Sequence, residues 1–90
     1  MKLEVTSITN ANAANLLEPG LTAIRAGDLV VDLGGVANAD SAAVALLLAW
    51  QRAAAAQGKR LTFAGVPSGV SSLAELYSVD DLLQLDGARA

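Results

Sequence analysis

The 90-residue sequence contains no cysteine and no histidine. The absence of cysteine excludes a disulfide framework and a thiolate zinc site, so the hydrophobic core has to hold the fold together. The absence of histidine removes the commonest general base and the commonest metal ligand. We therefore expect a protein that is not an enzyme, holds no metal or cofactor, and works inside the cell, in the cytoplasm.

Basic residues are also few, and the formal net charge is -3. They form no basic stripe for a nucleic acid backbone, because they are scattered over positions 2, 25, 52, 59, 60 and 89. The uncharged run from Ser41 to Gln51 is far shorter than the roughly twenty apolar residues of a membrane span. The first residues do not resemble a secretory signal. The sequence is nevertheless 53% hydrophobic. We expect these hydrophobic residues to pack against protein, without direct insertion into a membrane.

The apolar periodicity predicts one α/β domain over residues 1–90, in which residues 1–2 and 87–90 fray. Each predicted strand is followed by a helix, and the predicted strands cover residues 3–8, 29–33 and 59–66. The run at 29–33 lacks strict alternation, which is typical of a central strand covered on both faces. Residues 82–85 are expected to add a half-turn or a short edge strand.

The predicted helices differ in how clearly their ends are marked. The first follows capping residues at Thr9 and Asn10 and stops at Gly27, and Pro19 inside it predicts a kink or a division into two pieces. The helix over 41–57 is the clearest, with Gly58 as its expected left-handed cap. A short third helix is predicted after Pro67.

Asp40 and Ser41 lie where the helix over 41–57 begins. Backbone N–H groups at a helix start lack partners, so one interpretation is an Asp40 N-cap that contributes about 1 kcal/mol, with Ser41 as a small first-turn residue. A second interpretation is a switch, because the same N–H groups would hold a phosphate on Ser41. Catalysis by Ser41 is not predicted, because the sequence has no histidine to activate it and no G-x-S-x-G or S-x-x-K motif around it.

Between Ser41 and Trp50 the predicted helix carries no charge, and outside a stripe of Val44, Leu47 and Leu48 it is mostly alanine. A surface helix normally shows charge outside its buried stripe. Two interpretations stay open: the small side chains allow another protein to approach closely, or alanine is present as the best helix former. We expect Trp50 in the core, with its indole N–H bonded at the rim, rather than as an interface anchor.

Residues 30–83, VVDLGGVANADSAAVALLLAWQRAAAAQGKRLTFAGVPSGVSSLAELYSVDDLL, resemble the STAS domain. This fold is shared by anti-anti-sigma factors and by the small cytoplasmic subunit of the bacterial phospholipid-trafficking ABC transporter that maintains outer-membrane lipid asymmetry. The likeness covers residues 3–85 and is most specific in VVDL, the Asp40-Ser41 helix start, ALLLAW and LAELYSVDDLL. It implies a single STAS-type α/β domain, with a mixed four- or five-stranded sheet flanked by helices, that acts through protein contacts without catalytic residues.

The resemblance also implies a contact region. Ser41 matches the serine or threonine that partner kinases phosphorylate in anti-anti-sigma factors and that lies at a functional contact region in the transporter subunit. Asp40 matches the acidic residue before it. The sequence departs from the family just afterwards, because Ala42, Ala43 and Val44 stand where a Gly-Leu pair is common. The expected partner-binding or phospho-acceptor positions are Asn38, Asp40, Ser41, Ala42, Val44 and Ala45.

The ALLLAW run and the LAELYSVDDLL end look more like the transporter subunit than like the sigma regulators. We therefore expect a subunit that binds an ABC ATPase and supports its assembly or activity in phospholipid transport, peripheral to the inner membrane through that partner. The alternative is an anti-anti-sigma factor that regulates transcription through phosphorylation of Ser41 by an anti-sigma factor kinase. Whether the isolated chain forms a homodimer through its apolar surface stays open.

Overall fold

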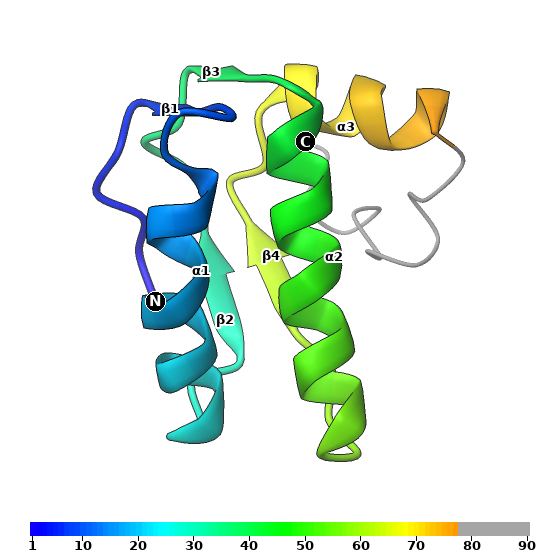
Figure 1. The fold of residues 1–90 in the computed structure, drawn as a ribbon. Coiled ribbons are helices and arrows are strands. Elements are labelled where there is room, and N and C mark those ends of the chain that lie inside the picture. The colour runs from blue at the N-terminus through cyan, green and yellow to red at the C-terminus, as the bar shows by residue number, and fades with distance from the viewer. Residues whose placement is uncertain (78–90) are drawn as a thin grey trace.

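The computed structural model describes residues 1–77, which form an α/β arrangement of three helices and four short strands. In chain order these are β1 (Ser7–Ile8), α1 (Ala13–Arg25), β2 (Val30–Asp32), β3 (Asn38–Ala39), α2 (Ser41–Ala56), β4 (Thr62–Ala64) and α3 (Ser68–Leu76) (Figure 1). Strand β1 pairs in parallel with β3, and β2 pairs in parallel with β4. The α/β class is confirmed, but the mixed sheet of four or five strands is not, because these strands form two separate two-stranded parallel ladders.

The β2–β4 ladder is buried on one face. Its register places Val31 opposite Phe63, and these side chains are 0% and 2% exposed. Helices α1 and α2 lie side by side on the same side of this ladder (Figure 1). The flanking residues of β2 and β4 point away from the helices, and Val30 is 49% exposed. The prediction of a central strand covered on both faces is therefore wrong for the described residues.

The N-terminal segment runs along β2 before it reaches β1. The backbone N–H of Asp32 donates to the Met1 carbonyl oxygen at 2.8 Å, and the Leu3 N–H donates to the Asp32 carbonyl oxygen at 3.1 Å. The Met1 ammonium lies 2.6 Å from the Asp28 carboxylate. The hydrogen bond from the Met1 ammonium to the Asp28 carboxylate lowers the pKa of Asp28, and the hydrogen bond from the Val30 N–H lowers it further. Residues 1–2 are thus paired, against the expectation that they fray.

The predicted strand over residues 3–8 is wrong in extent. Only Ser7–Ile8 forms a strand, because the chain leaves β2 after Leu3 and then pairs with β3 in the other ladder. Strand β3 itself was not predicted. Its two residues, Asn38 and Ala39, are too few to show a periodicity, and their side chains indicated only helix capping.

Helix α1 is continuous through Pro19, so the prediction of a two-piece helix is wrong. Proline removes the N–H that would bond the carbonyl of Asn15. Both Asn15 and Pro19 are exposed, so water can reach that carbonyl. The helix also begins later than predicted, because Asn12 and Thr9 close a turn in which the Asn12 carboxamide oxygen accepts from the Thr9 N–H at 2.9 Å.

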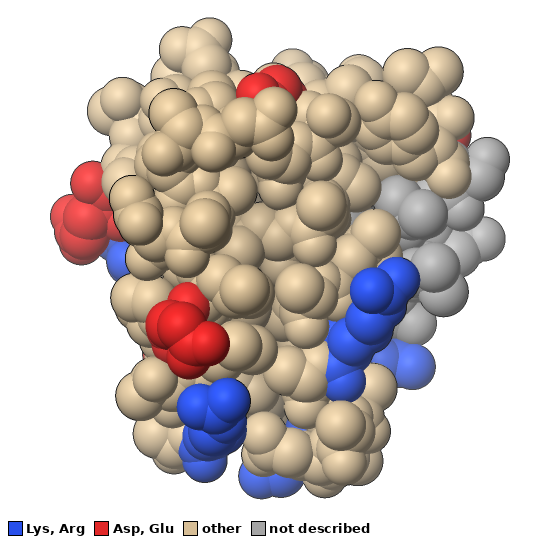
Figure 2. Space-filling view, in the orientation of Figure 1, with Lys and Arg blue, Asp and Glu red and all other residues tan. Residues whose placement is uncertain are grey.

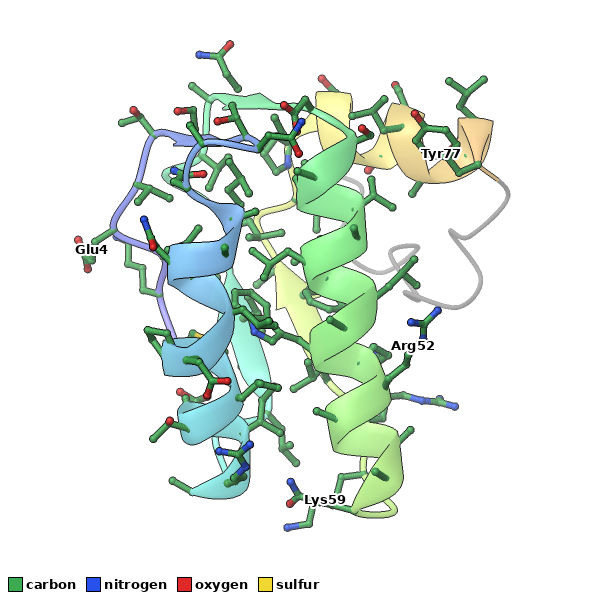
Figure 3. The ribbon with its side chains drawn as sticks, in the orientation of Figure 1. Glu4, Arg52, Lys59 and Tyr77 are labelled. Carbon is green, nitrogen blue, oxygen red and sulfur yellow. The ribbon has the colours of Figure 1, made fainter. Side chains whose placement is uncertain are left out.

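The later elements follow the predictions more closely. Helix α2 ends one residue before its predicted end, and Gly58 has a φ of 71° as a left-handed cap. Strand β4 occupies only the middle of the predicted range 59–66. Helix α3 is confirmed. Tyr77, which follows its last residue, is 51% exposed (Figure 3). The predictions for residues 82–85 and 87–90 lie outside the described residues.

Helices α1 and α2 pack tightly against each other at Gly20 and Trp50. The Trp50 side chain is 0% exposed, and its indole N–H donates to the Leu17 carbonyl oxygen at 3.1 Å. A methyl group on Gly20 would lie 2.2 Å from the Trp50 ring, so only glycine fits beneath the indole. The prediction of Trp50 as a core residue with a bonded N–H is confirmed.

Candidate functional site

Two helix starts meet at one edge of the molecule. The parallel register of β1 and β3 pairs Ile8 with Ala39, and the Asp40 N–H donates to the Ile8 carbonyl oxygen at 3.1 Å. The segments that follow the two strands therefore emerge together at their carboxyl ends. One is the turn at residues 9–12 that leads into α1, and the other is the first turn of α2 (Figure 1).

Asp40 caps α2 from this edge. Its backbone is extended, with a φ of -114°, and one carboxylate oxygen accepts from the Ala42 N–H at 2.8 Å. The other carboxylate oxygen accepts a longer bond, 3.4 Å, from the Asn10 N–H. The N-cap interpretation of Asp40 is confirmed, and the cap also links α2 to the turn before α1.

Ser41 follows the cap as the first residue of α2, and its side chain is exposed. At this position it lies close to backbone N–H groups at the positive end of the helix dipole. The hydroxyl is therefore accessible to a partner or a modifying enzyme. Whether Ser41 is phosphorylated stays a prediction.

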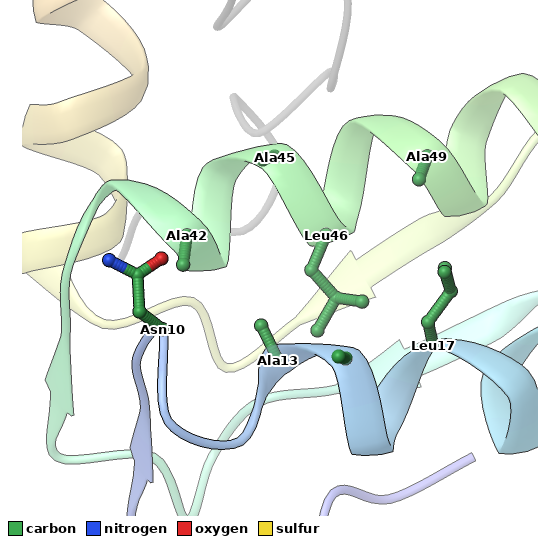
Figure 4. Close-up of a pocket in the computed structure, with 8 residues that line it drawn as sticks. Asn10, Ala13, Leu17, Ala42, Ala45, Leu46 and Ala49 are labelled. Carbon is green, nitrogen blue, oxygen red and sulfur yellow. The ribbon is translucent and has the colours of Figure 1, made fainter.

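A groove of about 350 Å³ runs from this edge along the contact between α1 and α2. Helix α1 and the turn before it contribute one wall, and α2 contributes the other (Figure 4). The lining residues are mostly alanine and leucine, with one polar side chain: Asn10, Ala13, Ala14, Leu17, Ala42, Ala45, Leu46 and Ala49. We call this surface the groove face. The space-filling view shows a broad uncharged area over these two helices, with charged side chains toward its margins (Figure 2).

Of the six predicted contact residues, only Ala42 and Ala45 line the groove face, while Asn38, Asp40 and Ser41 lie in β3 and at the start of α2. Ser41, Ala45 and Asn38 are exposed, and Asp40 and Ala42 are half-buried. Val44 is only 3% exposed, so its prediction as a contact residue is wrong. Val44 lies on the side of α2 that packs into the core with Leu47, as its place in the apolar stripe already indicated.

The half of the groove that α1 contributes was not predicted. Asn10, Ala13, Ala14 and Leu17 carry no motif, and they reach the site because β1 and β3 lie side by side. A sequence signal existed, since Ala13, Ala14 and Leu17 are small or apolar residues on adjacent turns of one helix. Their position opposite α2 depends on the tertiary pairing, which the sequence pattern alone did not show.

The groove face suits contact rather than bond chemistry. None of its lining residues is ionisable at neutral pH. Residues 1–77 contain no group of three or more acidic side chains that could hold a metal ion. Over the same residues, no helix is both long and apolar enough to cross a membrane.

Fold and site together define a class: a small α/β domain whose distinctive surface is a capped helix start beside an uncharged groove. A family model described as the Mlab, STAS domain matches residues 2–84, and the chain belongs to this STAS-domain family. The resemblance to STAS domains is thereby confirmed, and domains of this family are in general non-catalytic. No curated protein and no solved structure gives a significant match.

Proposed function

We propose that the chain is the STAS subunit of a bacterial phospholipid-trafficking ABC transporter, where it binds the ATPase and supports its assembly or activity. Membership of the Mlab STAS-domain family supports this proposal. The observation that carries it is the exposed Ser41 beside the uncharged groove face. In this role the chain lies in the cytoplasm and reaches the inner membrane only through its partner.

The mechanism is selective binding to one conformation of the ATPase. A partner that binds two conformations with different affinity shifts the population toward the one it prefers. Ala42, Ala45 and Ala49 allow a complementary helix or loop to approach the α2 backbone closely. Such a contact depends on shape, and a conformation of the ATPase that withdraws the matching surface would bind less tightly.

The test is capture of the purified ATPase of this transporter, taken from the same genome, by the wild-type chain and by Ser41→Glu. An acidic residue in the first turn of a helix is favourable to the helix dipole, so Ser41→Glu should fold as well as wild type. The new carboxylate would lie at the contact beside Asp40 and would have to be desolvated there. We expect capture to fall at least about tenfold, which corresponds to roughly 1.4 kcal/mol.

Ser72→Glu is the matched control, because Ser72 is an exposed serine on α3 that does not line the groove. This variant should capture the ATPase as wild type does. Equal capture by all three proteins would exclude Ser41 from the interface. No capture by the wild-type chain would reject the transporter role.

Exposure of Ser41 at the start of a 16-residue helix also favours a second candidate function. In an anti-anti-sigma factor, unmodified Ser41 would permit binding of an anti-sigma factor kinase and its phosphate would prevent it. The genes beside that of this chain separate the two candidates. Permease and ATPase genes favour transport, whereas an anti-sigma kinase gene favours the switch, and incubation with that kinase and ATP should then phosphorylate Ser41.

A further inference from the structure

Basic side chains gather toward the end of the molecule where α1 and α2 finish. Both helices begin near the edge that holds Ser41, and both run from there toward the opposite end (Figure 1). Arg25 is the last residue of α1, and Arg52 lies near the end of α2. The segment that leads from α2 to β4 adds two more basic residues. We call the four residues the basic end: Arg25, Arg52, Lys59 and Arg60.

The positive charge of the basic end is not compensated locally. All four side chains are exposed, and none forms an ion pair or a hydrogen bond with a described residue. The acidic residue in the turn between α1 and β2, Asp28, is already paired with the Met1 ammonium at 2.6 Å. The negative ends of the two helix dipoles contribute only about half an elementary charge each. Four full positive charges outweigh these contributions, and Figure 2 shows the Lys and Arg side chains mainly toward this end.

The basic end is a local feature of an acidic chain, whose formal net charge is -3. Asp40 lies at the opposite end, at the start of α2, and Glu75 lies on α3. This separation of charge turns the basic end toward any negatively charged surface that the molecule approaches. Ser41 then lies on the side away from that surface, where it stays accessible to a protein partner.

The residue types at the basic end indicate phosphate groups on a broad surface. Three of the four are arginines, whose planar guanidinium binds phosphate through paired hydrogen bonds. The four come from three separate segments, and none lines the groove face. Single-stranded nucleic acid would need aromatic side chains for its bases to stack on. However, Trp50 and Phe63 are buried, and Tyr77 follows α3, far from Lys59 in Figure 3. Phospholipid headgroups need no such side chains.

We propose that the basic end contacts the headgroups of anionic phospholipids at a membrane surface, without insertion into the bilayer. Each basic residue near such a surface raises the affinity about fivefold. Four exposed charges therefore orient the chain at the membrane but bind it only weakly. The proposal goes beyond the proposed function, in which the chain reaches the membrane only through its partner, because it adds direct contact with lipid once the chain is there.

The test is co-sedimentation of the purified full chain with vesicles over a series of lipid concentrations at low ionic strength. One set of vesicles contains phosphatidylglycerol and phosphatidylcholine in equal amounts, and the other contains phosphatidylcholine alone. We expect the chain to bind the first set only, and to be released as the salt concentration rises. Arg60→Gln should weaken this binding about fivefold, and Arg52→Gln combined with Arg60→Gln should weaken it about twenty-five-fold.

Lys2→Gln is the matched control for the loss of one positive charge. Lys2 is exposed on the N-terminal segment, where it pairs with Asp32 of β2, outside the basic end. This variant should bind the vesicles as wild type does. Circular dichroism of each variant verifies that it is folded.

Four results would overturn the proposal. They are no binding to the phosphatidylglycerol vesicles, equal binding to both sets, an equal loss for Lys2→Gln and Arg60→Gln, and tighter binding to single-stranded RNA at the same salt concentration. The ATPase assay is separate, because Arg52 and Arg60 do not line the groove face. Capture without vesicle binding would reject the lipid contact alone, and vesicle binding without capture would reject the proposed function alone.

Discussion

The contact between α1 and α2 is closed at one point and open at another. At Gly20 and Trp50 the indole fills the space completely, and even one added methyl group would collide with it. Nearer the N-terminal ends of the same helices, alanines face each other across an unfilled groove (Figure 4). The difference lies in the size of the facing side chains, since a glycine meets a tryptophan at one point and small residues meet each other at the other.

This comparison separates stability from recognition. A fully buried aromatic side chain gives the closed region a large share of the packing energy. The open region leaves its lining partly in contact with water. A partner that covers it would therefore gain the free energy of burying this apolar surface, which folding of the chain alone does not gain. Substitutions in the closed region should therefore change the free energy of unfolding, and substitutions in the open region should mainly change binding.

The largest effect is expected for Trp50→Ala. Removal of a fully buried tryptophan leaves a cavity between α1 and α2 and typically costs about 3–5 kcal/mol. Urea unfolding followed by circular dichroism measures the change, since the substitution removes the only tryptophan. Trp50→Phe keeps most of the ring and loses the bond to the Leu17 carbonyl, so it should cost distinctly less. A loss below about 1 kcal/mol for Trp50→Ala would show that the closed region does not dominate stability.

Gly20→Ala should come next, with a net loss of about 1–3 kcal/mol. The added methyl group would lie 2.2 Å from the Trp50 ring and would force the indole or α1 to move. Gly69→Ala is the matched control, because Gly69 lies in α3 with no neighbouring atom within 4 Å of an added methyl group. It should be neutral or stabilise by up to about 1 kcal/mol, since alanine is the better helix former. Equal effects at the two glycines would contradict the close approach.

The sequence predicted the parts of this comparison that local patterns encode. Asp40, the helix over 41–57 and Gly58 are a cap, a periodicity and a stop signal, and they follow one another along a single stretch of the chain. The buried environment of Trp50 was predicted from its large side chain and its need for a partner at the indole N–H. These features depend on neighbours along the chain, which a sequence displays directly.

The features that the sequence did not predict, or predicted wrongly, depend on contacts between residues that are far apart along the chain. Gly20 gave no sign that it lies under Trp50, because the two residues are far apart in the sequence and glycine has no side chain that reports a contact. The α1 wall of the groove depends on the pairing of β1 with β3, and a two-residue strand shows no alternation. Val44 was assigned to the contact surface by resemblance, although its periodicity with Leu47 indicated the core.

Asp40→Ala should have a smaller effect, a loss of about 1 kcal/mol, because the Ala42 N–H would lose its cap at the start of α2. Asp40→Asn keeps a side-chain oxygen for that N–H and should lose only a few tenths of that amount. Thermal unfolding of both variants measures the difference. If the two substitutions were equally harmful, the charge of Asp40, rather than its hydrogen bond, would stabilise the open end.

The smallest effect on stability is expected for Ala45→Leu, which adds three carbon atoms to the open region. Ala45 is exposed on α2, so the larger side chain can extend into the groove without displacing the core, and the free energy of unfolding should change by less than about 0.5 kcal/mol. The same substitution fills space that a partner would occupy, so capture of the ATPase should fall. Paired unfolding and capture measurements make the comparison quantitative. A large loss of stability would mean that the groove is already part of the packed core, and unchanged capture would mean that the partner does not enter it.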